Sequence, residues 1–331
     1  MDLTSLYYFQ ELSKDLNMTK TAERLYISQQ TLSNHIQRLE QYYGTKLFYR
    51  KPSLSLTCAG EFVLSFAQVV GKEERNLKDI LSDVEHQERG TLRFGASMAR
   101  GTQFLPRILP DFHQMYPRVE VRFVEGLSQG LERQTSNGEL DFALVLSDRY
   151  SPDLVEHEFL QDHIYLCVPE NLLRAYYTPE EVRERKIQAV QGVELRDFDR
   201  LPFALMTNRL GARIQEIFTR EHIQPNVFFT APSTAQTLPM CTKGLAACYC
   251  THMNLVEKRG TVDANVNIFP LYDQGVPLVQ KLSLLRHKQR YLTHFAKYFM
   301  DLTFQVAASI EKTPVRWIVQ QPAVEKSVEN V

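Results

Sequence analysis

Five polar side chains with strong hydrogen-bonding capacity recur on one side of a helix predicted near the N-terminus. They are Gln29, Gln30, Ser33, Asn34 and Gln37. Glutamine and asparagine can pair with adenine through two hydrogen bonds, and serine can donate or accept in the major groove of DNA. Such side chains pack poorly in a core, so the chemistry that this pattern favours is recognition of base edges. The alternative is an ordinary solvated helix surface.

Apolar residues explain why the helix would turn this side outward. Leu32, Ile36, Leu39 and Tyr43 recur at spacings of three and four and predict a buried stripe. Ser28 is expected to cap the start of the helix, and Gly44 to end it. A shorter helix with Met18, Ala22 and Leu25 on one face precedes it, and Tyr26 and Ile27 form the turn. The pattern is a helix-turn-helix.

A hairpin with a basic tip follows the two helices. Arg50 and Lys51 occupy the tip, where a wing would contact phosphate or the minor groove; an ordinary charged β-turn is the alternative. Residues 1–58 contain seven basic and five acidic side chains, a net charge of +2, whereas residues 59–90 carry a net charge of −3. The first segment is only weakly basic, so phosphate contacts must come from individually placed residues.

Residues 1–58 resemble the winged helix-turn-helix of LysR-type transcriptional regulators. The matching phrases are Leu6 to Phe9, Ala22 to Gln29, Leu32 to Glu40, Gly44 to Arg50, and Leu56 to Gly60. Gln30 departs from the family, which often has proline at the first helical turn. The resemblance implies double-stranded DNA as a partner. The candidate DNA-binding residues are Thr19, Ser28, Gln29, Gln30, Thr31, Ser33, Asn34, Gln37, Arg38, Arg50 and Lys51.

Residues 59–89 predict one long helix with an apolar seam of about three heptads. The seam consists of Phe62, Phe66, Val69, Leu77, Ile80 and Val84. Such a helix could pack on its own domain. The resemblance instead implies a linker through which two chains form a homodimer, and two such dimers form a homotetramer. Each DNA-binding head, residues 1–58, would then bind one half-site of the DNA.

From residue 90 the pattern alternates between strands and helices, which predicts parallel α/β sheets. Strands are expected at 91–96, 119–126, 140–146, 202–206, 226–231 and 245–250, and residues 157–169 look like paired strands. The segments Leu105 to Phe112 and Gly138 to Asp141 match familiar phrases of the same family, and its late Gly-Leu-Gly survives as Gly244-Leu-Ala246. The resemblance implies an α/β fold overall. Its effector domain over 90–310 would be two-lobed and periplasmic-binding-protein-like, with lobe I at about 90–162 and 267–310 and lobe II at about 163–266.

The residues that directly follow the predicted strands are the candidates for effector binding. Ligands of such folds bind at the carboxyl ends of the strands, where helix N-termini favour anions. These candidates are Ser97, Met98, Arg100, Ser128, Thr207, Arg209, Ser233 and Thr234. The hydroxyls could equally be helix caps, and the arginines surface charges. Ser97 and Ser128 match the family's effector-contacting loops, and Arg100 could clamp a carboxylate. A small anionic effector is therefore expected.

Other classes of function find little support. The sequence has no nucleophile elbow, phosphate-binding loop, zinc-protease helix or dinucleotide glycine run, so no enzyme activity, cofactor or metal is expected. A solute-binding protein would need a signal peptide and no DNA-binding head. No apolar run reaches about 18 residues, so a cytoplasmic chain without membrane contact is expected. RNA polymerase would be a further partner if the protein activates transcription.

The cysteines leave one alternative open. Five of them form no regular framework, and Cys248 and Cys250 lie in an apolar stretch that reads as a buried strand. Relatives that sense oxidants use a cysteine pair in this domain, and Cys241 with Cys248 or Cys250 resembles that arrangement superficially. A thiol-based redox regulator of the same family is thus the alternative to small hydrophobic core residues. The tail, residues 311–331 with the lone Trp317, is expected to be disordered.

Overall fold

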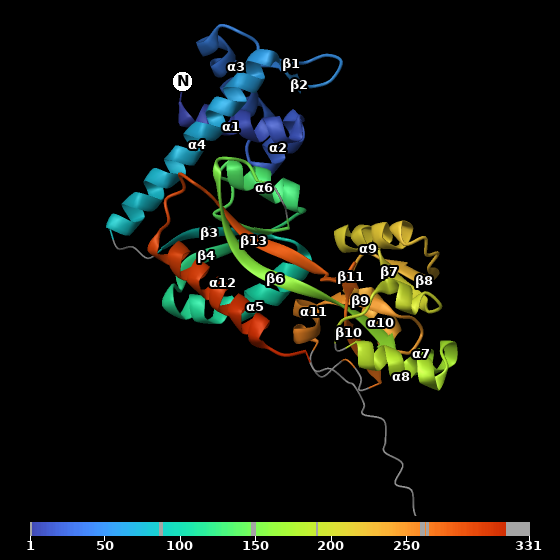
Figure 1. Ribbon diagram of the computed structural model, residues 1–331. Coiled ribbons are helices and arrows are strands. Elements are labelled where there is room, and N and C mark those ends of the chain that lie inside the picture. Colours follow the sequence, from blue (N-terminus) through green and yellow to red (C-terminus); the bar gives the residue numbers. More distant parts are fainter. Residues whose placement is uncertain are drawn as a thin grey trace, which may run out of the picture. The chain divides into compact units, whose positions relative to one another are not determined.

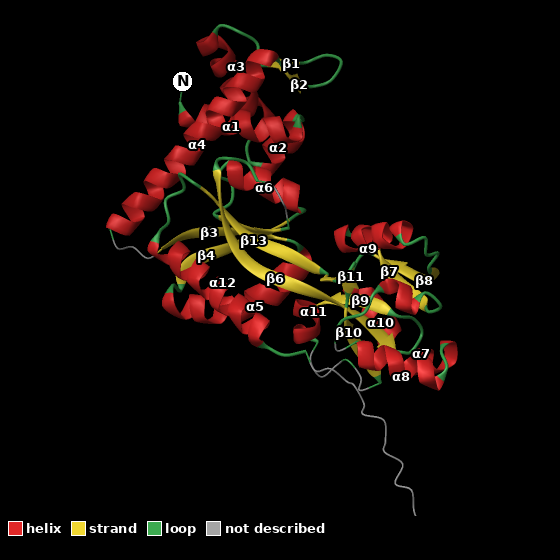
Figure 2. Cartoon of the chain, viewed as in Figure 1, coloured by secondary structure: helices red, strands yellow, loops and turns green. Residues whose placement is uncertain are grey.

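The computed structural model describes residues 2–85, 89–146, 150–189, 191–258, 262 and 265–315, which fall into two compact units. Unit 1 comprises residues up to 101, 108–157 and 284–301, and unit 2 comprises residues 102–107, 158–283 and those from 302 onward. Figure 1 labels the elements, and Figure 2 distinguishes helices from strands. Trp317 and most of the predicted tail lie outside the described residues.

The N-terminal part of unit 1 is a winged helix-turn-helix. Its elements are α1 (Leu3–Asp15), α2 (Met18–Arg24), α3 (Gln29–Tyr43), β1 (Phe48–Tyr49), β2 (Ser55–Leu56) and the start of α4 (Cys58–Val84). Of the predicted stripe of α3, Leu32, Ile36 and Leu39 are buried and pack with Phe9 of α1, and Tyr43 is half-buried against the same core. The Ser28 hydroxyl accepts from the Thr31 backbone N–H at 3.0 Å, and Gly44 ends the helix with a φ of +65°. The prediction for α3 is confirmed.

Glu40 and Gly60 fix the position of the wing through close packing. The buried carboxylate of Glu40 accepts from the Leu47 backbone N–H at 3.0 Å and from the Lys46 ammonium at 2.9 Å. At Gly60 a Cβ atom would lie 2.2 Å from the Leu47 carbonyl oxygen, so only glycine allows α4 to approach this closely. The wing is therefore fixed to both α3 and α4.

The remainder of unit 1 is built on parallel strands. Strand β3 (Arg89–Ala96) lies between β4 (Arg118–Glu125) and β5 (Phe142–Val145) and is parallel to both. The helices are α5 (Met98–Met115), α6 (Ser128–Ser136) and α12 (His294–Lys312), of which α5 and α12 extend beyond this unit. Phe299 of α12 contacts Phe94, Phe112 and Phe142, so α5 and α12 cover the same face of the sheet (Figure 1).

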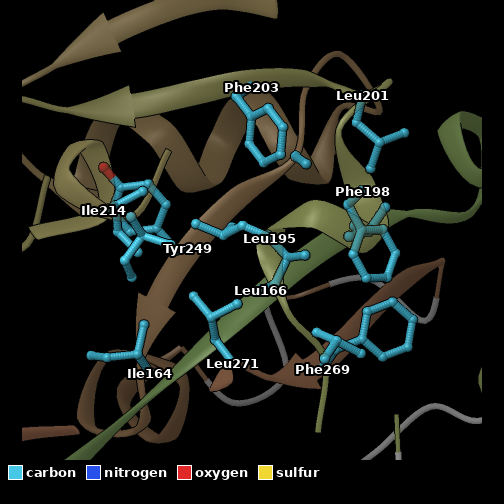
Figure 3. Close-up of a cluster of buried hydrophobic side chains, with 14 of the residues drawn as sticks. Ile164, Leu166, Leu195, Phe198, Leu201, Phe203, Ile214, Tyr249, Phe269 and Leu271 are labelled. Atoms are coloured by element: carbon cyan, nitrogen blue, oxygen red, sulfur yellow. The ribbon is translucent and has the colours of Figure 1, made fainter. Parts of the chain in front are cut away.

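Unit 2 contains parallel and antiparallel strand pairs around one large apolar core (Figure 3). Strand β7 (Pro202–Met206) is parallel to β8 (Asn226–Ala231), whereas β6 (Leu154–Pro169) is antiparallel to β9 (Cys248–Thr251) and β10 (Val266–Pro270). The other elements are α7 (Glu170–Tyr176), α8 (Pro179–Gln188), η1 (Leu195–Phe198), α9 (Arg209–Arg220), α10 (Thr234–Thr242), α11 (His252–Glu257), β11 (Tyr272–Asp273), β12 (Val276–Pro277) and β13 (Val279–His287). The first residues of β6 and the last residues of β13 belong to unit 1.

The structure differs from the predicted elements in the region of β6 and in that of α7 and α8. Residues 157–169 are not a strand pair but part of the single 16-residue strand β6, whose neighbours β9, β10 and β13 come from far along the chain. Residues 267–283, which the resemblance assigned to lobe I, fall in unit 2, where β10 pairs with β6. Helices α7 and α8 were not foreseen. Thr178 begins α8 with a capping box, a signal that the sequence did contain.

Candidate nucleic-acid interface and effector site

The surface of α3 opposite its buried stripe is polar. Gln29, Gln30, Asn34 and Gln37 are exposed and Ser33 is half-buried. The Gln30 amide N–H donates to the Asn34 side-chain oxygen at 3.0 Å, so these two amides are held side by side. The helix thus presents several amide donors and acceptors without an apolar residue among them, which suits the edges of bases.

Three other predicted DNA-binding residues lie at the start of the two helices. The Ser28 hydroxyl is occupied by the Thr31 backbone N–H and lies 2.8 Å from the Thr31 hydroxyl, so it serves first as a cap. Thr19 is exposed at the start of α2. Tyr26, which the sequence placed only in the turn, is 96% exposed and is a contact candidate that the pattern missed.

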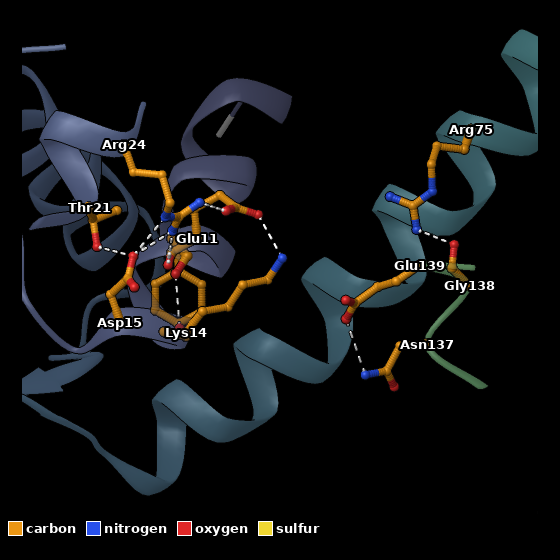
Figure 4. A network of polar contacts seen from close by, with 11 residues as sticks. Glu11, Lys14, Asp15, Thr21, Arg24, Arg75, Asn137, Gly138 and Glu139 are labelled. Carbon is orange, nitrogen blue, oxygen red and sulfur yellow. Dashed lines mark hydrogen bonds and ion pairs between the residues drawn. The ribbon is translucent and has the colours of Figure 1, made fainter. Parts of the chain in front are cut away.

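Most basic residues of α1 and α2 are engaged within the domain, as Figure 4 shows. Arg24 donates to Asp15 at 2.6 and 2.9 Å and to the carboxylate of Glu11. Lys14 also donates to Glu11, at 2.9 Å. Burial opposes the charge of Glu11, but hydrogen bonds from Lys14 and Arg24 outweigh it and lower the pKa of that carboxyl. These cations therefore hold α1 and α2 together by pairing with carboxylates, and they are not the main candidates for phosphate contacts.

The cations that remain for phosphate lie on α3 and at the wing. Arg38 and Lys51 are exposed, and neither has an acidic partner within the described residues. The Arg50 guanidinium lies 4.0 Å from Glu40 yet is 58% exposed. The wing pairs Tyr49 with Ser55, so residues 50–54 form its tip, and the structure places Arg50 and Lys51 there as predicted.

In unit 1 the candidate effector residues gather at two neighbouring strand ends. Ala96 of β3 lies opposite Glu125 of β4, so Ser97 and Ser128 start their helices at the same edge. The Ser97 side chain makes no capping bond to α5. The Ser128 hydroxyl instead accepts from the Leu146 backbone N–H at 3.1 Å. Met98 is exposed and Arg100 half-buried.

In unit 2 a second group forms at the ends of β7 and β8. Met206 lies opposite Ala231, which brings Thr207 and Arg209 near Ser233 and Thr234. Asn208, not Thr207, caps α9, with its side chain accepting from Gly211 at 3.0 Å. A pocket of about 240 Å³ beside β7 is lined by Thr207. This is below the usual 300–1,000 Å³ of ligand pockets, so it would take at most part of a ligand.

Two amides that the sequence did not single out join this second group. The Asn254 amide donates to the Thr234 hydroxyl at 3.2 Å, and the Gln103 amide donates to Asn254. Gln103 is only 4% exposed, and its side-chain oxygen has no hydrogen-bond partner among the described residues. A buried unpaired acceptor is costly unless something donates to it. Gln103 and Asn254 are 151 residues apart, so local sequence patterns could not predict their contact.

A buried charge network joins α4 to the rest of unit 1. Arg290 is 7% exposed and binds Asp141 at 2.5 and 2.7 Å, Asp79 of α4 at 2.6 Å and the Asn76 amide oxygen at 2.9 Å. Burial lowers the pKa of Arg290, but Asp141 and Asp79 more than offset this and raise it. Arg75 adds a bond to the Gly138 carbonyl at 2.9 Å (Figure 4). The phrase from Gly138 to Asp141 thus anchors the long helix.

Comparison with known families matches both halves of this architecture. Residues 3–61 match the family described as bacterial regulatory helix-turn-helix protein, lysR family, and residues 85–308 match the LysR substrate binding domain. The chain belongs to the LysR family of transcriptional regulators. It carries the family's effector-binding domain, and a solute-binding protein without a DNA-binding head is excluded.

Relatives of the LysR family align over most of the chain. The uncharacterized regulator YcgK of Bacillus subtilis is 27% identical over 315 residues, covering 92% of this chain and 94% of YcgK. Full-length OxyR C199D of Pseudomonas aeruginosa has the same fold, with a TM-score of 0.64, 20% identity and coverage of 97% and 99%. Full-length CbnR complexed with its target DNA aligns with a TM-score of 0.55, 17% identity and coverage of 93% and 100%.

Two further features bear on expectations for this LysR-type chain. Among the described helices, none combines the length and apolar character needed to cross a membrane. Cys241, Cys248 and Cys250 are buried, and the structure has them as free thiols among apolar side chains.

Proposed function

We propose that α3 reads base edges through Gln29, Gln30 and Ser33, while Arg50 and Lys51 contact phosphate. The observation that carries this proposal is the polar, exposed face of α3 opposite a buried apolar stripe. Support comes from CbnR, a family member of similar fold that has been crystallised with its target DNA. Thr19, Thr31, Asn34, Gln37 and Arg38 surround this face and supply further contacts.

The proposed DNA function is tested by sequencing the genomic fragments that the purified protein retains. A dimer with two heads should retain a small set of fragments that share a motif with two half-sites. Uniform retention of all fragments would contradict sequence-specific reading. The genes beside the retained fragments would also show which operons the protein controls.

We further propose that α4 is the dimer contact. Seven apolar side chains of this helix are exposed in the single chain, between 37% and 74%: Phe62, Phe66, Val69, Leu77, Ile80, Leu81 and Val84. Exposed apolar residues gathered on one helix in this way mark an interaction surface. The spacing of three and four suits a second copy of the same helix, which places two DNA-binding heads on one dimer. Pairing of such dimers gives the proposed tetramer.

The effector is proposed to be a small anion bound by the residues that follow the strands. Support comes from the two groups of hydroxyls and arginines, around Ser97 in unit 1 and around Thr207 and Thr234 in unit 2. The helices that begin there, α5 and α9, direct backbone N–H groups at an anion. In this scheme RNA polymerase is a partner when the regulator activates transcription.

A screen of carboxylate metabolites by thermal shift tests the effector proposal. A bound hit should bind Ser97→Ala more weakly by about 1.5–3 kcal/mol, the value of a hydrogen bond to a charged group. Ser97 suits the test because its hydroxyl makes no capping bond to α5. Thr219→Ala, on the exposed side of α9, is the matched control and should bind normally. Equal stabilisation of wild type and Ser97→Ala would place the effector elsewhere.

A further inference from the structure

Four of the five cysteines meet in the interior of unit 2. Cys167 lies on β6, Cys248 and Cys250 lie on β9, and Cys241 lies on α10. Each is fully buried. Cys167 stands directly opposite Cys248 in the antiparallel pairing of the two strands, and Cys250 is two residues further along the same face. The fold thus brings together residues separated by about eighty positions.

The sulfur atoms of Cys167, Cys248 and Cys250 converge on one point. All three lie within 4.8 Å of one another, and the sulfurs of Cys248 and Cys250 are 3.9 Å apart. Metal–thiolate bonds are about 2.3 Å long, so three sulfurs around one ion would be separated by roughly 4 Å. The distances between the three sulfur atoms in this structure are already close to that value. Cys241 is different, because its sulfur lies 3.4 Å from the Cys167 carbonyl oxygen as a donor.

The surroundings restrict the charge of any ion at this point. The cysteines lie in an apolar cluster with side chains such as Leu238, Leu255 and Ile268. The groups that act on the pKa of Cys167, Cys248 and Cys250 are the neighbouring cysteines together with burial, and among the described residues none of these groups is a lysine or arginine. An uncompensated charge is costly in such a place. Three thiolates carry three negative charges, so a divalent ion would leave one of them unbalanced. A trivalent ion balances all three thiolates and gives a neutral complex.

We propose that Cys167, Cys248 and Cys250 form a binding site for a trivalent thiol-binding ion of the arsenite type. Arsenous acid enters as the neutral molecule As(OH)3 and reacts with the three thiols. Three As–OH and three S–H bonds break, three As–S bonds and three molecules of water form, and arsenic stays trivalent. No oxidant or reductant is needed. Because the site is closed to solvent, uptake requires local opening of β9 and is slow.

The proposal is tested on the reduced full-length protein incubated with sodium arsenite and freed of excess reagent. We expect one arsenic per chain by elemental analysis and three sulfur neighbours by X-ray absorption. Cys248→Ala and Cys250→Ala should each lose most of the retained arsenic. Cys241→Ala and Cys58→Ala, which remove a neighbour and the exposed cysteine, should keep it.

Several outcomes would overturn the site. These are absence of arsenic from the folded wild type, loss of arsenic in Cys58→Ala, or fewer than five reactive thiols in the denatured protein before arsenite is added. Retention of Cd²⁺ but not of arsenite would refute the charge argument. The X-ray absorption measurement uses the wild-type protein. It can therefore refute the proposal even if an alanine variant fails to fold.

Discussion

Helices α3 and α4 each bury one face and expose the other, but their exposed faces have opposite chemistry. The exposed face of α3 carries amides and a hydroxyl, whereas that of α4 carries phenylalanine, leucine, isoleucine and valine. The buried faces are alike, since both pack apolar residues such as Ile36 and Val63 into the same core. The outer chemistry of an amphipathic helix therefore indicates the partner. Polar α3 suits base edges, and apolar α4 suits a second copy of itself.

Substituting aspartate into the α4 stripe should have the largest effect. Phe66→Asp or Ile80→Asp would bury an unpaired charge, and a symmetric dimer contains the change twice. We expect a loss of about 4 kcal/mol or more in association, about a thousandfold in the dimer dissociation constant. Sedimentation at micromolar protein should then show monomers or separated pairs. Glu61→Lys is the control, because Glu61 is exposed on the same helix and no residue of the stripe lies three or four positions from it. A mass unchanged by Phe66→Asp would move the interface away from α4.

On its inner side, α4 is joined to the rest of unit 1 by charged side chains. Asp141→Asn leaves the buried guanidinium of Arg290 with Asp79 as its one remaining carboxylate partner among the contacts described. Breaking a buried pair in this way costs about 3–5 kcal/mol in the free energy of unfolding. Urea denaturation measures the loss, and Asp301→Asn, an exposed carboxylate of α12, should show none. Equal stability of both variants would mean that the network contributes little.

On α3 the expected effect is smaller and depends on the DNA. Gln29→Ala should cost about 1–3 kcal/mol at its own base pair and little on DNA where that pair is already changed. Fluorescence anisotropy with operator and scrambled duplexes gives the two affinities. Lys20→Ala, whose ammonium faces Asp15 on α1, provides a comparison on the same domain. If Gln29→Ala weakened both duplexes equally, the residue would be a general contact and not a reader.

The smallest effect on specificity is expected at the wing. Arg50→Ala should weaken operator and scrambled DNA alike, because phosphate is the same in both. Each lost phosphate contact should also reduce the slope of log affinity against log salt by about 0.9. Titrations at several salt concentrations measure this slope, with Arg122→Ala, an exposed arginine of β4, as the control. A change in base preference at Arg50→Ala would show that the wing reads sequence.

Local patterns were enough to predict the elements of the head and many strands. Ser28, Gly44 and the stripe from Leu32 to Leu39 act within one or two helical turns, so their roles follow from spacing. The predicted strands 202–206 and 226–231 coincide with β7 and β8. These features depend on neighbours in the sequence, and the sequence shows them directly.

The contacts that join distant segments could not be predicted in this way. The Arg290–Asp141 pair spans 149 residues and the Gln103–Asn254 bond spans 151. Neither contact is part of a periodic pattern in the sequence from which it could be predicted. The long strand β6 was read as two because its alternation gives no sign that β9 and β10 would be its partners. The sulfurs of Cys167, Cys248 and Cys250 also converge only through the pairing of β6 with β9, so their proximity could not be predicted from the sequence.

The most direct test of the α3 assignment is selection from a random pool of duplexes by two proteins in the same buffer. One is wild type, and the other combines Gln29→Ala, Gln30→Ala and Ser33→Ala, which leaves the buried stripe of α3 intact. Wild type should enrich a motif with two half-sites. The variant should still bind DNA through its unchanged arginines and lysines but enrich no motif. If the variant enriches the same motif as wild type, the exposed face of α3 does not read the bases.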